Sequence, residues 1–189
     1  MKLLKDRIKK EGIVISDSIL KVDSFLNHQI DPQLMNAMGE EIANRFRGDN
    51  PTKILTIEAS GIAVALMVGL HLKLPLLFAK KKKPSTLKEA LYTAKVHSFT
   101  KNSTSDIVVS AKYLSPDDRV LIVDDFLATG SAAIALAEIV RQSGAILVGV
   151  AVAIEKGFQS GKEALTSQNI RVESLVSLQS LKEGKITFG

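Results

Sequence analysis

Short runs of consecutive apolar residues alternate along the chain with longer segments that are rich in alanine and leucine. The short runs lack polar alternation and predict buried strands over 52–57, 75–81, 119–125 and 145–156. The longer segments predict helices over 60–74 and 131–144, the second closed by Gly144. Continuous apolar strands that alternate with helices are typical of a parallel sheet covered on both faces. The pattern therefore predicts an α/β fold with a central, mainly parallel sheet flanked by helices.

The first part of the chain adds two helices before the first predicted strand. Leu3, Leu4 and Ile8 share one side of an initial charged helix. A second helix begins near position 31, where Asp31 is the expected N-cap and Pro32 the expected first helical residue.

Two further segments interrupt the alternation of strands and helices. Residues 84–106 are polar, rich in serine, threonine and lysine, and contain the turn-like cluster KNSTSD. A polar excursion beside a strand end indicates a hairpin or a mobile lid. Residues 174–189 predict one more short strand or edge element.

Composition limits the class of protein without naming it. The 189 residues suit one domain, and 46% hydrophobic with 24% charged residues is ordinary for a globular protein. No apolar run is long enough to span a bilayer, and the charged start lacks the features of a secretory signal. The absence of cysteine excludes a disulfide framework and a thiolate metal site. These features favour a cytoplasmic protein with no membrane partner.

The net charge of +5 allows either nucleic acid or phosphorylated small molecules as partners. The basic residues are scattered, except for the run Lys80–Lys83. Aromatic residues make up only 5% of the chain, and no aromatic-rich strand offers a platform for stacking bases. The composition therefore argues against nucleic acid as the main partner.

The segment VLIVDDFLATGSA, Val120–Ala132, contains the clearest candidate for a binding site. Gly130 allows a tight turn and close approach of a ligand to the backbone. The helix that starts near Ser131 directs its unpaired N–H groups and its positive dipole end into that turn. The hydroxyls of Thr129 and Ser131 add donors, so the turn suits a phosphate group.

Two adjacent carboxylates, Asp124 and Asp125, precede this turn at the end of the predicted strand. Ligands of open parallel sheets bind beyond the carboxyl ends of the strands. Because carboxylates repel a phosphate, the pair must serve another part of the ligand, either sugar hydroxyls or a magnesium shell. A phosphate beside vicinal hydroxyls describes a ribose 5-phosphate.

Other proteins also carry paired acids at a strand end. P-loop ATPases require a GxxxxGK[ST] loop, which this chain lacks. Receiver domains have their acidic pair near the start of the domain, whereas this pair lies two-thirds along the chain. A structural turn explains either aspartate alone, but it explains poorly both aspartates together with the hydroxyl-rich helix start.

The whole segment resembles the phosphoribosyl pyrophosphate (PRPP) signature of the type I phosphoribosyltransferases, which combines four apolar residues, two acids and a Thr-Gly loop. In detail the chain is similar to the bacterial xanthine phosphoribosyltransferases, relatives of the adenine enzymes. The resemblance implies one phosphoribosyltransferase domain over 1–189, with a mobile loop and a hood over the base from about 1–50 and the C-terminal tail. It also implies a cytoplasmic homodimer for purine salvage that converts xanthine and PRPP to xanthosine 5′-monophosphate, with Mg²⁺ bound to PRPP.

Residues at the PRPP end are assigned by this resemblance. The loop that would cradle the 5-phosphate is Ala128, Thr129, Gly130, Ser131 and Ala132, and the catalytic pair on the ribose hydroxyls is Asp124 and Asp125. A second loop would bind pyrophosphate through Glu58, Ala59, Ser60 and Gly61. The adenine enzymes usually carry arginine where this chain has Ser60, and Lys81 from the basic run is the expected replacement charge. Residues 87–105 would form the mobile loop, with Tyr92 and Lys95 as candidates in it.

The purine end is assigned in the same way. Lys156 occupies the position from which 6-oxopurine enzymes donate to the 6-oxo group. Leu20 would pack on the ring and Asn27 would bond a purine edge, whereas Phe158 is a further stacking candidate or a core residue. No residue, and none of the three histidines, is assigned to a metal.

Two alternatives stay open at this point. One is the same reaction on guanine or hypoxanthine. The other is a regulator that senses PRPP without catalysis and binds nucleic acid, for which a steep salt dependence of binding is expected.

Overall fold

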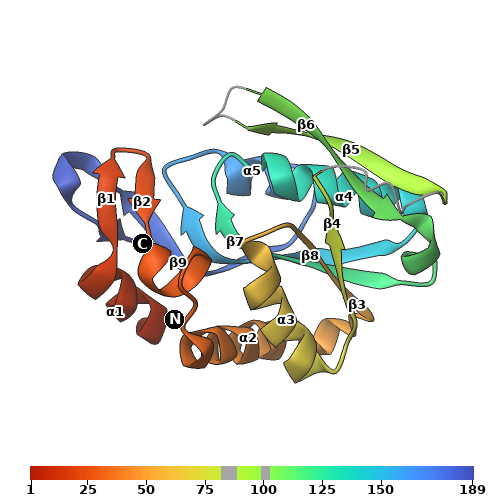
Figure 1. Cartoon of the computed structure of the whole chain (residues 1–189), viewed down its shortest axis with the longest axis horizontal. Helices are drawn as coiled ribbons and strands as arrows, with labels where there is room; N and C mark the ends of the chain where they lie inside the picture. Colours follow the sequence, from red (N-terminus) through yellow and green to blue (C-terminus); the bar gives the residue numbers. More distant parts are fainter. Residues whose placement is uncertain (82–88, 99–102) are drawn as a thin grey trace.

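The computed structural model describes residues 1–81, 89–98 and 103–189. Its centre is a six-stranded sheet with the strand order β10-β9-β8-β7-β3-β4 (Figure 1). Five strands are mutually parallel: β3 (Lys53–Ile57), β4 (Leu76–Ala79), β7 (Arg119–Leu127), β8 (Ile146–Lys156) and β9 (Val172–Ser180). The short β10 (Thr187–Phe188) pairs antiparallel with β9 at one edge. The predicted α/β fold with a mainly parallel sheet is confirmed.

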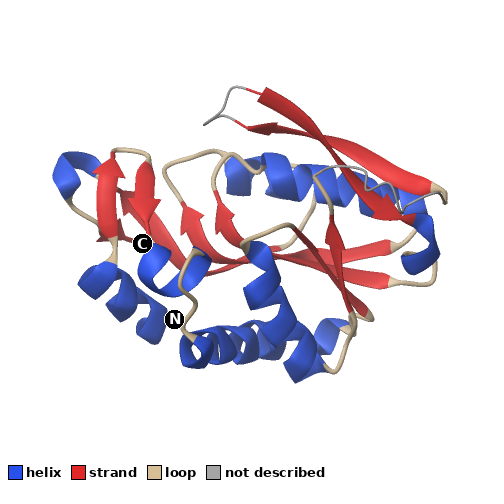
Figure 2. Cartoon of the chain, viewed as in Figure 1, coloured by secondary structure: helices blue, strands red, loops and turns tan. Residues whose placement is uncertain are grey.

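Helices cover both faces of this sheet (Figure 2). One face packs on α2 (Pro32–Phe46) and α3 (Gly61–Leu72), and the other packs on α4 (Ser131–Ser143) and the short α5 (Gly161–Thr166). Burial on both faces explains why the central strands β7 and β8 are nearly continuous apolar runs. The carboxyl ends of the parallel strands therefore lie between two apolar layers.

The expected caps of the helices are present. The Asp31 side chain accepts hydrogen bonds from the N–H groups of Gln33 and Leu34, and Pro32 is the first residue of α2. Helix α4 ends at Gly144, whose φ of 76° is the left-handed conformation that glycine adopts readily.

The N-terminal part forms a small layer at one end of the sheet. It contains α1 (Lys2–Glu11), the hairpin of β1 (Ile13–Ser16) with β2 (Ile19–Lys21), and the π-helical turn η1 (Asp23–Asn27). Leu4 and Ile8 of α1 are fully buried, but Leu3 is 52% exposed, so its predicted place on the buried side is wrong. At 100° per residue, Leu3 and Leu4 cannot both face the centre of a narrow contact. Figure 1 shows the C-terminal strand at the same end of the molecule.

The polar segment before β7 forms a long hairpin of β5 (Leu91–Ser98) and β6 (Ser103–Ser110). It lies over α4, where the Gln142 side chain bonds both the N–H and the C=O of Thr93. A pair of backbone hydrogen bonds between Lys80 and Val108 joins the end of β4 to β6. The hairpin therefore extends from the carboxyl edge of the sheet across α4.

Within the described ranges, no helix is long and apolar enough to cross a membrane.

Candidate active site

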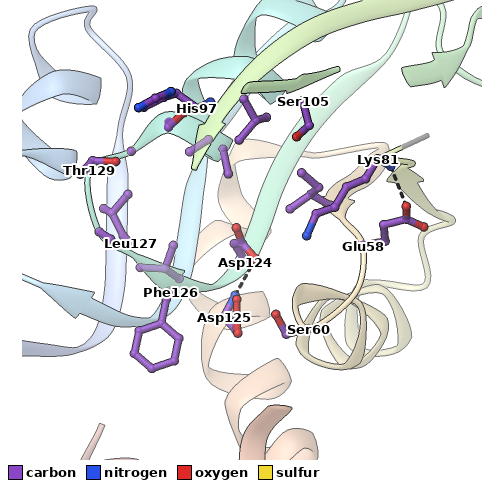
Figure 3. Close-up of a pocket in the computed structure, with 18 residues that line it drawn as sticks. Glu58, Ser60, Lys81, His97, Ser105, Asp124, Asp125, Phe126, Leu127 and Thr129 are labelled. Carbon is purple, nitrogen blue, oxygen red and sulfur yellow. Dashed lines mark hydrogen bonds between the residues drawn. The ribbon is translucent and has the colours of Figure 1, made fainter. Parts of the chain in front are cut away.

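A cavity of about 590 Å³ lies beyond the carboxyl ends of β3 and β7. It brings together five segments that are far apart in the sequence: the end of β3 with the β3–α3 loop, Lys81 after β4, the β5–β6 hairpin, residues 124–133, and Val152 of β8 (Figure 3). This is the edge at which parallel sheets bind ligands, because strand ends and helix N-termini meet there. The predicted phosphate loop and acid pair are therefore neighbours in one cavity.

Ala128–Gly130 join β7 to α4, and Ser131 and Ala132 begin that helix; all five residues line the cavity. Gly130 adopts a φ of 84° and serves as the N-cap of α4, whose end receives no hydrogen bond from a capping side chain. The first N–H groups of α4 are therefore available to an anion, and the helix dipole favours its charge. This backbone is the feature of the site best suited to a phosphate.

Two segments hold this loop from outside. The N–H of His97 in β5 donates to Oγ of Ser131 over 2.9 Å, which places the hairpin against the start of α4. On the other side, the N–H of Gly161 donates to the carbonyl of Ala128 over 3.0 Å. The Ser131 hydroxyl keeps its own proton for a ligand, because its oxygen is the acceptor in the bond with His97.

The acid pair lies inside β7 rather than at its end, because the strand continues through Phe126 to Leu127 and pairs there with β8. Asp124 and Asp125 are 7% and 8% exposed, and the N–H of Asp125 donates to Oδ1 of Asp124 over 2.9 Å. Side chains of neighbouring strand residues point to opposite faces. In Figure 3 Asp124 lies on the side of Lys81, whereas Asp125 lies on the side of Ser60.

Burial sets the electrostatics of this pair. It raises the pKa of Asp124 well above its ordinary value, and the neighbouring Asp125 raises the pKa further. The positive charge of Lys81 acts in the opposite direction. Without a ligand Asp124 therefore resists ionisation, and hydroxyl or cationic groups of a ligand would favour its ionised form.

The second predicted loop follows β3. Glu58 and Ser60 line the cavity. Ala59, which is exposed, and Gly61, which is buried, do not line it. The Glu58–Ala59 peptide bond is cis. Oε1 of Glu58 accepts the backbone N–H of Lys81 over 2.6 Å, which fixes the end of β4 beside this loop. Figure 3 shows the Lys81 side chain extended toward Asp124.

The three residues predicted for the purine lie in the N-terminal layer or in contact with it, and they do not line the cavity described above. The Lys156 ammonium donates to the carbonyl of Ser18 in the β1–β2 turn over 2.7 Å and lies 5.6 Å from the ring centre of Phe126. Burial lowers the pKa of Lys156, and the charge of Asp125 opposes this shift. Leu20 of β2 is buried in the core, and Asn27 is exposed at the end of η1.

The remaining candidates are placed less centrally. Tyr92 is partly buried against the core under the hairpin, Lys95 is exposed, and Phe158 is 37% exposed after β8. Lys82 and Lys83 of the basic run lie outside the described residues, as do parts of the predicted mobile loop, 87–88 and 99–102.

Sequence reasoning missed several residues at the cavity. Val96, His97 and Ser105 of the hairpin line it, although they stand in a segment with no recognisable motif. Gly161 supports the phosphate loop, and its only sequence signal was its position in a turn after β8. Contacts between distant segments of this kind leave no local pattern, so the sequence offered little to find them by.

The fold and the cavity define a class of protein, and the comparisons identify it. Residues 22–176 match the model of the phosphoribosyl transferase domain. The chain belongs to the phosphoribosyl transferase family.

Curated relatives cover the whole chain. A protein named xanthine phosphoribosyltransferase from Moorella thermoacetica is 62% identical over 188 residues, which span 100% of this chain and 96% of that protein. A protein of the same name from Pseudomonas aeruginosa is 54% identical, over 100% of this chain and 99% of its own.

Solved structures agree on the fold. Adenine phosphoribosyltransferase from Rhodothermus marinus superposes with a TM-score of 0.76 at 23% identity, over 94% of this chain and 100% of that chain. The enzyme from Trypanosoma brucei, solved with AMP, pyrophosphate and ribose-5-phosphate, has a TM-score of 0.76 at 20% identity, over 92% of this chain and 79% of that chain. At these identities the likeness shows the type I phosphoribosyltransferase fold.

Proposed function

We propose that the protein transfers ribose 5-phosphate from PRPP to xanthine, which gives xanthosine 5′-monophosphate and pyrophosphate and serves purine salvage. The observation that carries the proposal is the single cavity in which the uncapped α4 start, the buried acid pair and Lys81 meet. The relative from Moorella thermoacetica, 62% identical over its nearly full length, supports xanthine as the base.

At the phosphate end, Ala128, Thr129, Gly130, Ser131 and Ala132 would hold the 5-phosphate. The backbone N–H groups of the α4 start supply donors, and the hydroxyls of Thr129 and Ser131 add two more. The hydrogen bonds from His97 and Gly161 fix this loop before the ligand arrives, so little ordering is required on binding.

Asp124 and Asp125 would accept hydrogen bonds from the ribose hydroxyls. Both carboxylates lie between the phosphate loop and the second loop, which is the order of groups along PRPP itself. A transition state with oxocarbenium character develops positive charge on the sugar, and nearby buried carboxylates stabilise such a charge. The pair would thus act on the reacting sugar, without forming a bond to it.

The leaving pyrophosphate would lie against the second loop, where Glu58, Ala59, Ser60 and Gly61 precede α3, and against Lys81. The Lys81 side chain lines the cavity, its charge acts on Asp124, and it would replace the expected arginine. It would neutralise charge that develops on the leaving group.

Magnesium would arrive bound to the oxygens of PRPP. The carboxylates of Asp124 and Asp125 at the cavity are oxygen donors, which suit a cation that the substrate carries. Oxygen ligands from the substrate are those that Mg²⁺ prefers. The cation would supply neutralisation of the pyrophosphate when bound.

At the base end, Lys156 would donate to the 6-oxo group of the purine, with Leu20 on the ring and Asn27 on an edge. Lys156 is already half-buried and bound to the carbonyl of Ser18, so it can exchange one oxygen acceptor for another. A donor at this position disfavours adenine, which presents an amine there.

The arrangement of the whole chain belongs to the same proposal. Residues 1–189 would act as one domain, with residues 1–50 and the C-terminal tail as the hood and the hairpin as the mobile loop. The enzyme would be a cytoplasmic homodimer that acts on small molecules.

The direct test is incubation with PRPP, Mg²⁺ and each purine in turn, with the nucleotide identified by mass. Xanthosine 5′-monophosphate is the expected product, and a higher rate with guanine or hypoxanthine would favour that alternative base. Asp125→Ala and Lys156→Ala should lower turnover by about 100-fold or more without loss of the fold. Exposed Lys2→Ala in α1 is the matched control for removal of a charge.

The alternative of a PRPP-sensing regulator makes a different prediction. It requires binding to DNA or RNA that weakens steeply with salt, and it requires no nucleotide product. Product formation with weak, unspecific binding to nucleic acid would exclude it.

A further inference from the structure

Thr56 is a buried polar residue that the proposed reaction does not yet use. It lies in β3 between Leu55 and Ile57, which belong to the core on the α4 side of the sheet. Because neighbours in a strand alternate, Thr56 faces the α3 side. It is fully buried, and its hydroxyl is the one buried side-chain oxygen or nitrogen without a hydrogen-bond partner among residues 1–81, 89–98 and 103–189.

The Thr56 hydroxyl and the Asp124 carboxyl border the same small space. A Cβ atom added to Gly61 would overlap Oγ1 of Thr56 and would lie 2.5 Å from Oδ1 of Asp124 and 3.4 Å from its Cα. The absence of a side chain at Gly61 therefore leaves a space at the start of α3 that both oxygens border, although no hydrogen bond joins them in the structure.

A buried hydroxyl without a partner is unfavourable, and so is a buried carboxylate with too few donors. Among the described residues, Asp124 accepts a hydrogen bond from the N–H of Asp125, although a carboxylate offers about four lone-pair sites. A hydroxyl that donates to an ionised carboxylate forms a charge-assisted bond, which is stronger than a neutral one. Each group therefore supplies what the other lacks.

We infer that Thr56 is a positioning residue: a small rotation of its side chain brings the hydroxyl to donate to the Asp124 carboxylate, which is then held in the orientation that receives the ribose of PRPP. The inference rests on the proposed function for the role of Asp124 in binding ribose. The hydrogen bond between Thr56 and Asp124 is independent of that function. Gly61 then has a second role beside its place in the pyrophosphate loop, because only glycine leaves room for this contact.

Two substitutions separate positioning from packing. Thr56→Val keeps the shape of the side chain and removes the hydroxyl, whereas Thr56→Ser keeps the hydroxyl and removes a buried methyl group. With saturating xanthine, Thr56→Val should lower kcat/KM for PRPP by about tenfold or more, which is the usual effect of one hydrogen bond to a charged group. Its thermal midpoint should fall less than that of Thr56→Ser, because the shape of the buried side chain is kept.

Thr56→Ser should retain kcat/KM within about twofold despite a lower thermal midpoint, because it keeps the donor but creates a small cavity. Wild-type kcat/KM in Thr56→Val would overturn the inference. Equal losses in both variants, in proportion to their midpoints, would show a packing role and would also overturn it.

A spectroscopic readout keeps this test independent of the reaction. The ¹³C resonance of the Asp124 carboxyl should move in Thr56→Val and stay in place in Thr56→Ser, with or without PRPP. If the wild-type chain forms no nucleotide from any purine, the proposed function fails, and the resonance alone decides the contact. A resonance that is unchanged in Thr56→Val refutes it.

Discussion

Substitution of Gly161 by alanine tests whether the phosphate loop must keep its present backbone. Gly161 begins α5, and its N–H donates to the carbonyl of Ala128 over 3.0 Å. Its Cα also packs against Gly130, the N-cap of α4. The two loops approach so closely that neither has room for a side chain at this point.

The size of the effect follows from the geometry. A Cβ atom on Gly161 would overlap the carbonyl oxygen of Ala128 and lie 2.9 Å from the N atom of Gly130. Carbon requires about 3.5 Å from such atoms, so the loop must retreat by roughly 1 Å. A misplacement of that size costs about 100-fold in catalysis when it disturbs substrate positioning. We expect Gly161→Ala to raise KM for PRPP and lower kcat/KM by that order.

The assay is steady-state formation of xanthosine 5′-monophosphate with PRPP varied and xanthine saturating. Gly48→Ala is the matched control, because Gly48 is exposed and nothing lies within 4 Å of the added Cβ atom. It should leave KM and kcat/KM unchanged. A wild-type KM for PRPP in Gly161→Ala, in a folded protein, would refute the reasoning that this contact fixes the phosphate loop.

Three further predictions concern the pair, the hairpin and the core. Burial, followed by the charge of Asp125, raises the pKa of Asp124 above its ordinary value of 3.8. The contribution of Asp124 to the free energy of unfolding is therefore fully present below pH 3.8 and is lost as the pH rises through the raised pKa. Asp124→Asn should therefore raise the thermal midpoint at pH 7 but not near pH 3, and equal midpoints at pH 7 would contradict this. Ser131→Ala removes the acceptor of the His97 N–H, so this N–H should exchange faster with deuterium. The N–H of Thr93, which donates to Gln142, is the control and should keep its exchange rate. An unchanged exchange rate at His97 would count against docking of the hairpin on α4 through Ser131. Phe46→Ala should lower the free energy of unfolding in urea by ~3–5 kcal/mol because this ring is fully buried, and a loss under about 1 kcal/mol would contradict it.

The order of elements could be read from the sequence because each element has its own periodicity. The apolar runs at β3, β7 and β8 are buried on both faces, and such strands need no polar alternation. The α2 start at Asp31–Pro32 follows from local chemistry alone. Strand ends were less predictable, and β7 extends past the acid pair because Phe126 and Leu127 still pair with β8.

In the candidate site too, some features could be predicted from the sequence and others could not. The phosphate loop is one continuous segment, so its glycine, hydroxyls and helix start stand together in the sequence. The contribution of Lys81 was predicted from its position after a strand, and the structure brings it to the cavity. Lys82 and Lys83 of the run lie outside the described residues, so the comparison between the four lysines stays a prediction.

By itself, then, the sequence determined the strand and helix order and the local chemistry of the 120–132 segment, because both depend on residues close together in the chain. Only the tertiary structure brought the His97 N–H to Ser131, Gly161 to the phosphate loop, and Thr56 with Gly61 to Asp124. These contacts join separate segments at a few ångströms, and they depend on the register and packing of the whole sheet. No local pattern encodes such distances, because they result from how all the elements fit together.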